Sequence, residues 1–254
     1  MSRRLYSRLE TLTGTIRAAV IDTVLNFGPI REVFNDPQYV ADAVQATSVR
    51  FAGAPRGSWA GLQTALPDGH LASSDGPLVA ALKSSRAMFQ SRIGLTFSSS
   101  TNACDGPPVY DALTSNAYIY PTAQPCQHIL LGILRAPLAD ERFDNVSLAT
   151  RVGYVLAHEL GHNALVSHWH PDRLWSLLWR YTDNLHSEAL ADVIAVVAIV
   201  RTGMASAQEV CERVSQVWCA RVRFDYSPRA DASHPGPNFR GDALCETLRD
   251  LGFL

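Results

Sequence analysis

The chain lacks three features that would point to particular classes of protein. It has no excess of one charge, since 22 Lys and Arg stand against 24 Asp and Glu in 254 residues. A net charge of −2 gives no electrostatic reason to expect nucleic acid or an anionic membrane as a partner. Its longest apolar run, Val193–Val200, is far shorter than the ~20 residues of a bilayer-spanning helix. Charged residues recur from Arg3 to Asp22, which is unlike the apolar core of a signal peptide. We therefore expect a soluble protein with no integral membrane association, and the cytoplasm is the favoured location.

Cysteine is scarce, and its spacing indicates no zinc knuckle. The five cysteines neither pair off evenly nor form short ligand pairs. Cys104 and Cys126 flank one loop-rich segment and could form a disulfide in an oxidising compartment. Cys211 and Cys219 lie about 12 Å apart along a predicted helix, too far to bond each other. We expect buried thiols in a reducing compartment.

The most informative feature that is present is the pentapeptide HELGH at His158–His162. Two histidines four residues apart on a helix project from one face, where both imidazoles can reach a single zinc ion. Glu159 is not needed as a ligand, so it is free to take a proton from zinc-bound water. Five of the eight histidines lie between His158 and His186, so the clustering is not a compositional accident. The plain alternative is a surface helix with two solvated histidines.

A catalytic zinc site needs a third protein ligand, and Glu188 is the first of two candidates. Glu188 lies 26 residues after His162, and Asp192 follows on the same helical face. Glu188 can complete the zinc ligands, while Asp192 can accept the remaining N–H of a zinc-bound histidine. Both carboxylates could instead cap the start of a helix, where acidic residues are favoured. The helix beyond them is apolar almost all round, so acidic groups at its mouth need partners.

The second candidate is His168, which follows His162 at the spacing of the metzincin peptidases. That arrangement needs a sharp turn made by glycine, where this chain has Leu165. Met204, the only methionine after the pentapeptide, does not lie in a convincing Met-turn. We therefore favour Glu188 as the third ligand of one zinc ion.

The hydrophobic pattern predicts short strands followed by helices, with the HELGH helix running from Ser147 through His162. This order indicates an α+β, zincin-like metallopeptidase fold: a small mixed sheet with an active-site helix beneath it, and a largely helical C-terminal half. We divide the chain into an N-terminal helical and loop-rich region of unknown role, 1–110, and a catalytic domain, 111–254. The remaining elements are helices at 4–26, 37–50 and 77–91, strands at 93–97, 117–120 and 129–134, and a capping box at Ser206 and Glu209.

Five segments in a fixed order resemble the gluzincin metallopeptidases, and within them the HtpX-like and CAAX-prenyl-protease family. They are Asn116–Pro121, Leu131–Leu134, the pentapeptide with its lead-in Val155-Leu156-Ala157, Glu188-x-x-Ala191-Asp192, and Ser233-His234-Pro235 with Arg240. The likeness covers roughly residues 116–240. The membrane helices of well-known members are missing here, and Thr122–Pro125 replaces the glycines that usually follow the first segment.

The resemblance implies roles for residues of these segments. His158, His162 and Glu188 would bind zinc, with Glu159 as general base and Asp192 behind the ligands. An edge strand containing Asn116, Ala117 and Tyr118 would hold an extended peptide by main-chain hydrogen bonds. His234 or Arg240 would stabilise the oxyanion of the tetrahedral intermediate.

The function that we predict is that of a zinc metalloendopeptidase acting on protein or peptide substrates. The rival from another class is a catalytically silent, zinc-stabilised binding module of the same fold. A metzincin-type peptidase with His168 as the third ligand is a further alternative, and the composition is also compatible with an exported effector.

Overall fold

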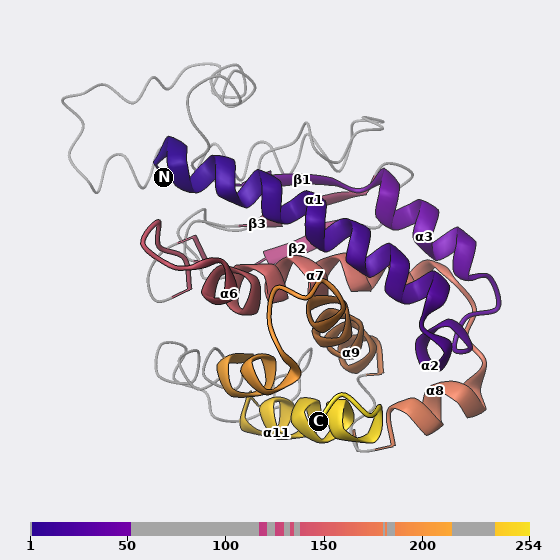
Figure 1. The fold of residues 1–254 in the computed structure, drawn as a ribbon. Coiled ribbons are helices and arrows are strands. Elements are labelled where there is room, and N and C mark those ends of the chain that lie inside the picture. The colour runs from indigo at the N-terminus through magenta and orange to yellow at the C-terminus, as the bar shows by residue number, and fades with distance from the viewer. Residues whose placement is uncertain are drawn as a thin grey trace, which may run out of the picture.

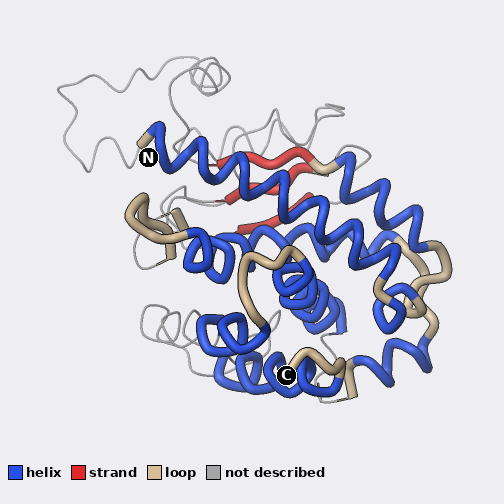
Figure 2. Tube along the Cα trace, viewed as in Figure 1, coloured by secondary structure: helices blue, strands red, loops and turns tan. Residues whose placement is uncertain are grey.

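The computed structural model describes residues 2–51, 117–120, 125–129, 133–134, 138–179, 181, 186–214 and 237–254. Helices dominate these residues, and the strands form one small sheet that packs against the HELGH helix (Figures 1 and 2). The helices that begin the chain are α1 (Arg3–Asn26), α2 (Gly28–Arg31) and α3 (Pro37–Ala46). The strands are β1 (Ser48–Phe51), β2 (Ala117–Tyr120) and β3 (Cys126–Ile129). The later elements are α6 (Asn145–Leu148), η1 (Ala149–Gly153), α7 (Tyr154–Gly161), η2 (His162–Val166), α8 (Pro171–Leu177), α9 (His186–Arg201) and α11 (Pro237–Asp250), with a further helix at 207–214.

The sheet is mixed, as predicted, with the strand order β1-β3-β2. β1 runs parallel to β3, and β2 pairs with β3 in antiparallel fashion, so that Ala117 lies opposite Ile129. The predicted strand at 117–120 is confirmed. The strand predicted at 129–134 is misplaced, because the paired residues are Cys126–Ile129 and Leu134 lies in a turn. Hydrophobicity was the wrong guide here, since the central strand buries Gln127, whose side-chain amide donates to the carbonyl of Leu156.

The helix predicted at 37–50 is four residues too long, because α3 ends at Ala46 and β1 begins at Ser48. The hydroxyl of Thr47 donates to the carbonyl of Ala43, which satisfies one of the acceptors at the end of the helix. Ser48 then donates its N–H to the carbonyl of Pro125, and the chain enters the sheet. Pairing with a distant strand therefore overrides the local helical pattern.

Helix α1 packs against one side of the HELGH helix, and its apolar residues belong to the same hydrophobic core as those of the C-terminal helices. Its buried positions recur at helical spacing and pack against α9, α3 and α7. The buried apolar residues form one cluster that runs from Leu5 to Leu248. Ser2 caps this helix by accepting the N–H of Leu5. The predicted domain boundary near residue 110 lies outside the described residues, as do the helix predicted at 77–91 and the strand predicted at 93–97.

The HELGH helix is confirmed and continues on both sides of the predicted range. It begins at Asn145, passes through a π-helical turn at η1, and ends in the 3-10 turn η2. Asp144 caps it by accepting the N–H of Ser147. Short π-helical turns of this kind are frequent at functional sites. The predicted capping box is also confirmed, since Ser206 and Glu209 each accept the other's backbone N–H.

Two expectations about side chains are wrong. Cys211 and Cys245 form a disulfide, and Cys126 is also disulfide-bonded. These bonds contradict the free, buried thiols that we expected. The partly helical spacing of Trp169, Trp175 and Trp179 favours packing in the core, but Trp175 and Trp179 are 51% and 61% exposed.

Among the described helices, none is long and apolar enough to span a membrane.

Candidate metal centre

Helix α7 places both histidines of the pentapeptide on one face. The two Nε2 atoms lie 3.2 Å apart, and the rings meet edge to face. His158, Glu159 and His162 each offer a ligand atom, and these atoms lie within 4.8 Å of one another. Their side chains are largely buried. The i, i+4 spacing on a buried helix therefore produces a compact set of metal-ligating groups, as predicted.

Glu188 enters this set from the first turn of α9. Its Oε2 lies 3.3 Å from Nε2 of His158, and its Oε1 lies 3.4 Å from Nε2 of His162. Zn–N and Zn–O bonds of about 2.0–2.1 Å in tetrahedral geometry place two ligand atoms about 3.3–3.4 Å apart. The distances of 3.2–3.4 Å among the three side chains are close to these values, with a different oxygen of Glu188 facing each histidine, so this donor set is compatible with one zinc ion.

The close approach of α7 and α9 depends on Gly161 and Ala191. A Cβ atom added at Gly161 would lie 3.0 Å from Cα, 3.2 Å from the carbonyl oxygen and 3.3 Å from Cβ of Ala191. Ordinary contacts of this kind are 3.4–4 Å long. Glycine at position 161 thus lets the two backbones meet at this separation, and a larger residue would require α9 to shift by a few tenths of an ångström.

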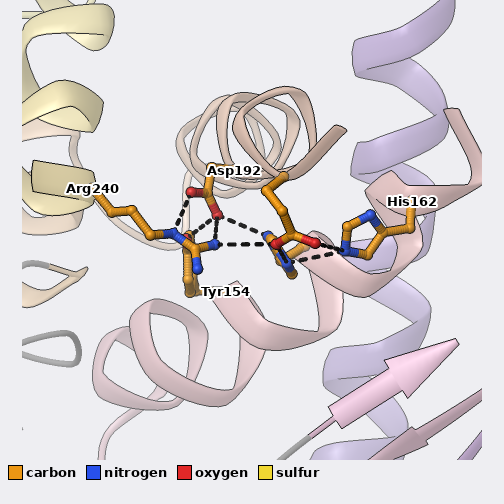
Figure 3. Close-up of polar contacts among 6 residues, drawn as sticks. Tyr154, His162, Asp192 and Arg240 are labelled. Carbon is orange, nitrogen blue, oxygen red and sulfur yellow. Dashed lines mark hydrogen bonds and ion pairs between the residues drawn. The ribbon is translucent and has the colours of Figure 1, made fainter. Parts of the chain in front are cut away.

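Asp192 lies behind the candidate ligands and is completely buried. Its Oδ1 lies 2.8 Å from Nδ1 of His158 and accepts hydrogen bonds from the hydroxyl of Tyr154 and from Nη2 of Arg240, both at 2.5 Å. Its Oδ2 accepts from Nε of Arg240 at 2.7 Å. Figure 3 shows this chain of contacts from Arg240 through Asp192 toward His162. The negative charge of the buried carboxylate is therefore compensated by the bidentate guanidinium of Arg240, the hydroxyl of Tyr154 and the imidazole of His158.

The charges around the site explain its protonation. Burial opposes a charge on His158, but the Asp192 and Glu188 carboxylates outweigh it and raise the pKa of His158 to about 9. Burial and the nearby charge of His158 lower the pKa of His162 to about 4. Burial alone would raise the pKa of the Asp192 carboxyl, yet Arg240 and His158 hold it well below its usual range. A cation bound here would have to displace the proton of His158.

The structure places the other predicted site residues as follows. Arg240, which we predicted at the oxyanion, is only 1% exposed, and its guanidinium contacts Asp192 and lies 3.8 Å from Oε2 of Glu188. Ala117 lies in β2, an edge strand of the described sheet, and Tyr118 pairs there with His128. Asn116 and His234 lie outside the described residues. His168 is exposed, and its carbonyl accepts the N–H of Asn35.

Sequence reasoning missed Tyr154. It lies four residues before His158, so the two side chains share a face of the helix, and its hydroxyl reaches the carboxylate that lies beside His158. The signal was available as a tyrosine one helical turn before the first histidine. Nothing local, however, distinguished a buried hydroxyl with a partner from an ordinary core aromatic.

The chain was compared with known proteins. No protein-family model matches it, and no curated protein matches it in sequence. Among solved structures it is similar to the zinc metalloprotease Zmp1 of Mycobacterium tuberculosis, a crystal structure in complex with an inhibitor, with a TM-score of 0.62 at 15% sequence identity. The similarity covers 98% of this chain and 45% of that chain, so the present chain spans less than half the length of its structural neighbour. The fold is that of a zinc metalloprotease, which confirms the predicted α+β, zincin-like class.

Proposed function

We propose that this chain is a zinc-dependent metallopeptidase that hydrolyses internal peptide bonds of proteins or peptides. The observation that carries the proposal is a cluster of four side-chain atoms: the two Nε2 atoms lie 3.2 Å apart, and each lies 3.3 or 3.4 Å from one oxygen of the Glu188 carboxylate. Two histidines and one glutamate are the ligand set of a catalytic zinc site, in which one position stays open for water or substrate. His158, His162 and Glu188 would hold one ion.

A zinc ion held by these ligands acidifies water and polarises a carbonyl oxygen. The chain's own contribution is the placement of a base and of its supports. Glu159 is not needed as a ligand, and its carboxylate lies with the two imidazoles, where it can accept a proton from the attacking water and pass it to the leaving amine. Asp192 would hold the ring of His158 in place through Nδ1.

An extended peptide would lie along β2, which is an edge strand of the described sheet and packs on α7. Main-chain hydrogen bonds to such an edge hold a substrate without regard to its side chains. This proposal takes Ala117 and Tyr118 as part of the substrate-binding strand, together with Asn116.

The sequence resemblance to the HtpX-like and CAAX-prenyl proteases predicts the same ligands. Because no family model matches the chain, we do not assign it to that family. Glu188, rather than His168, lies beside the imidazoles, which favours a gluzincin over a metzincin arrangement. The oxyanion role of Arg240 or His234 stays a prediction. The described contacts of Arg240 support a role exerted through Asp192.

The test is a comparison of Glu159→Gln with the wild type in zinc content and in cleavage of a mixed peptide library. We expect the variant to keep one zinc ion per chain and to lose turnover, since Glu159 moves protons and is not a ligand. Glu188→Ala should instead lose zinc. Glu212→Gln, an exposed glutamate on the helix at 207–214, is the matched control and should leave both measurements unchanged.

A zinc-loaded wild type that cleaves nothing would favour the silent binding module, and a Glu159→Gln protein as active as the wild type would refute the mechanism.

A further inference from the structure

We infer that Tyr154 is a positioning residue of the metal centre, which holds the Asp192 carboxylate where it fixes the ring of His158. This inference rests on the proposed zinc site and adds a residue to it. Tyr154 begins α7, directly after the π-helical turn, and it is buried. No segment that carries the family resemblance includes it.

The geometry joins three side chains through one oxygen atom. The Tyr154 hydroxyl donates to Oδ1 of Asp192 at 2.5 Å, and the same oxygen lies 2.8 Å from Nδ1 of His158. Tyr154 and His158 are one helical turn apart, with ring centroids 6.2 Å apart. The hydroxyl therefore ties the carboxylate to the same helix that carries the imidazole.

Arg240 alone does not supply this tie. Its guanidinium binds both oxygens of Asp192, but it comes from α11, a different element from the helix of the histidines. If the guanidinium were its only partner, the Asp192 carboxylate could rotate whenever α11 shifts, and its Oδ1 could then turn away from His158. The Tyr154 hydroxyl opposes this rotation, because it holds Oδ1 on the side of α7.

The chemistry of the donors sets the tautomer of His158. A phenol hydroxyl and a guanidinium both donate, so Asp192 is the acceptor in each contact. Asp192 can then accept the proton of Nδ1, which leaves the lone pair of Nε2 directed at His162 and Glu188. Residues that orient a histidine ligand in this way commonly change metal affinity by about 10- to 100-fold when they are removed.

The experiment compares Tyr154→Phe with Tyr6→Phe, which removes the hydroxyl of a half-buried tyrosine of α1 that donates to the carboxylate of Glu10. Zinc affinity is measured by competition with a chromogenic chelator, and Co²⁺ is used as a spectroscopic probe of the ligand geometry. We expect Tyr154→Phe to bind zinc about 10- to 100-fold more weakly and to show an altered Co²⁺ absorption band. Tyr6→Phe should bind both ions like the wild type.

The outcomes separate this inference from the proposed function. If the wild type binds no zinc, the metal centre itself is refuted. If the wild type binds zinc and Tyr154→Phe binds it with unchanged affinity and an unchanged Co²⁺ band, the positioning role is refuted while the metal centre stands.

A second variant covers the case in which Tyr154→Phe does not fold. Incorporation of 4-aminophenylalanine at position 154 keeps the ring and a neutral donor, so zinc affinity should stay within a few-fold of the wild type. A loss as large as that expected for phenylalanine would overturn the inference, because the donor would then be irrelevant.

Discussion

The contact between Gly161 and Ala191 allows a quantitative test of how the candidate metal centre is assembled. Alanine at position 161 would place a Cβ atom 3.0 Å from Cα and 3.2 Å from the carbonyl oxygen of Ala191. Both are backbone atoms, so the clash cannot be relieved by rotation of a side chain. To restore an ordinary contact of 3.4 Å or more, α9 must move away from α7 by about 0.4 Å or more.

Two opposing effects determine the change in stability. A Gly→Ala substitution in a helix gains about 1 kcal/mol of helical propensity. Overpacking of a close contact costs about 1–3 kcal/mol. Gly153→Ala is the matched control in the same continuous helix, because its added Cβ would meet neighbours no closer than 3.5 Å, which is ordinary contact. Gly161→Ala should therefore be about 1–3 kcal/mol less stable than Gly153→Ala.

The assay is thermal unfolding of both variants without metal, followed by zinc titration. A difference of about 1–3 kcal/mol corresponds to a gap of roughly 2–12 °C between the two midpoints. Zinc affinity should fall in Gly161→Ala alone, because Glu188 and Asp192 lie on the helix that must move. The reasoning is refuted if Gly161→Ala unfolds at the same temperature as Gly153→Ala, or at a higher one, and binds zinc equally well.

Three further predictions follow from other parts of the structure. Cys245→Ser removes the disulfide to Cys211, which spans 34 residues, and should lower the free energy of unfolding by about 3–4 kcal/mol in urea titrations. An unchanged midpoint would show that the bond is not formed in solution. Arg240→Met leaves the buried Asp192 carboxylate without its bidentate partner and should cost about 3–5 kcal/mol, against less than 1 if the pair were unimportant. Burial raises the pKa of Tyr181 well above its usual value of 10, so stability that is present below pH 10 should be lost at higher pH. Absorbance at about 295 nm should show fewer tyrosines ionising near pH 10 in the folded wild type than in urea, and Tyr181→Phe should reduce that difference; ionisation of all tyrosines near pH 10 in the folded protein contradicts this.

Much of the candidate site could be predicted because its pattern is local. Two histidines four residues apart must share a face of any helix, and the capping box at Ser206 and Glu209 needs only its own turn. Glu188 and Asp192 could be paired by the same spacing, and the apolar run after them correctly indicated a buried helix. These features depend on backbone geometry over one or two turns.

The errors have the opposite cause. The register of β3, the end of α3 at Ala46 and the exposure of Trp175 all depend on which distant segments meet them. A short apolar run and a short helix are each compatible with several tertiary environments. Local propensity is a weak guide when pairing across the sheet decides the outcome.

The amino-acid pattern by itself was sufficient to predict a candidate metal centre, because the two histidines and the glutamate between them lie within two adjacent helical turns. Only the folded chain decided that Arg240 contacts the Asp192 carboxylate, that Gly161 lies against Ala191, and that Cys211 and Cys245 are bonded. Each of these contacts joins residues at least 30 positions apart. A polar contact among them, such as that of Arg240 with Asp192, matters for stability because a buried charge without a partner is costly. Such contacts exist only after the helices have packed.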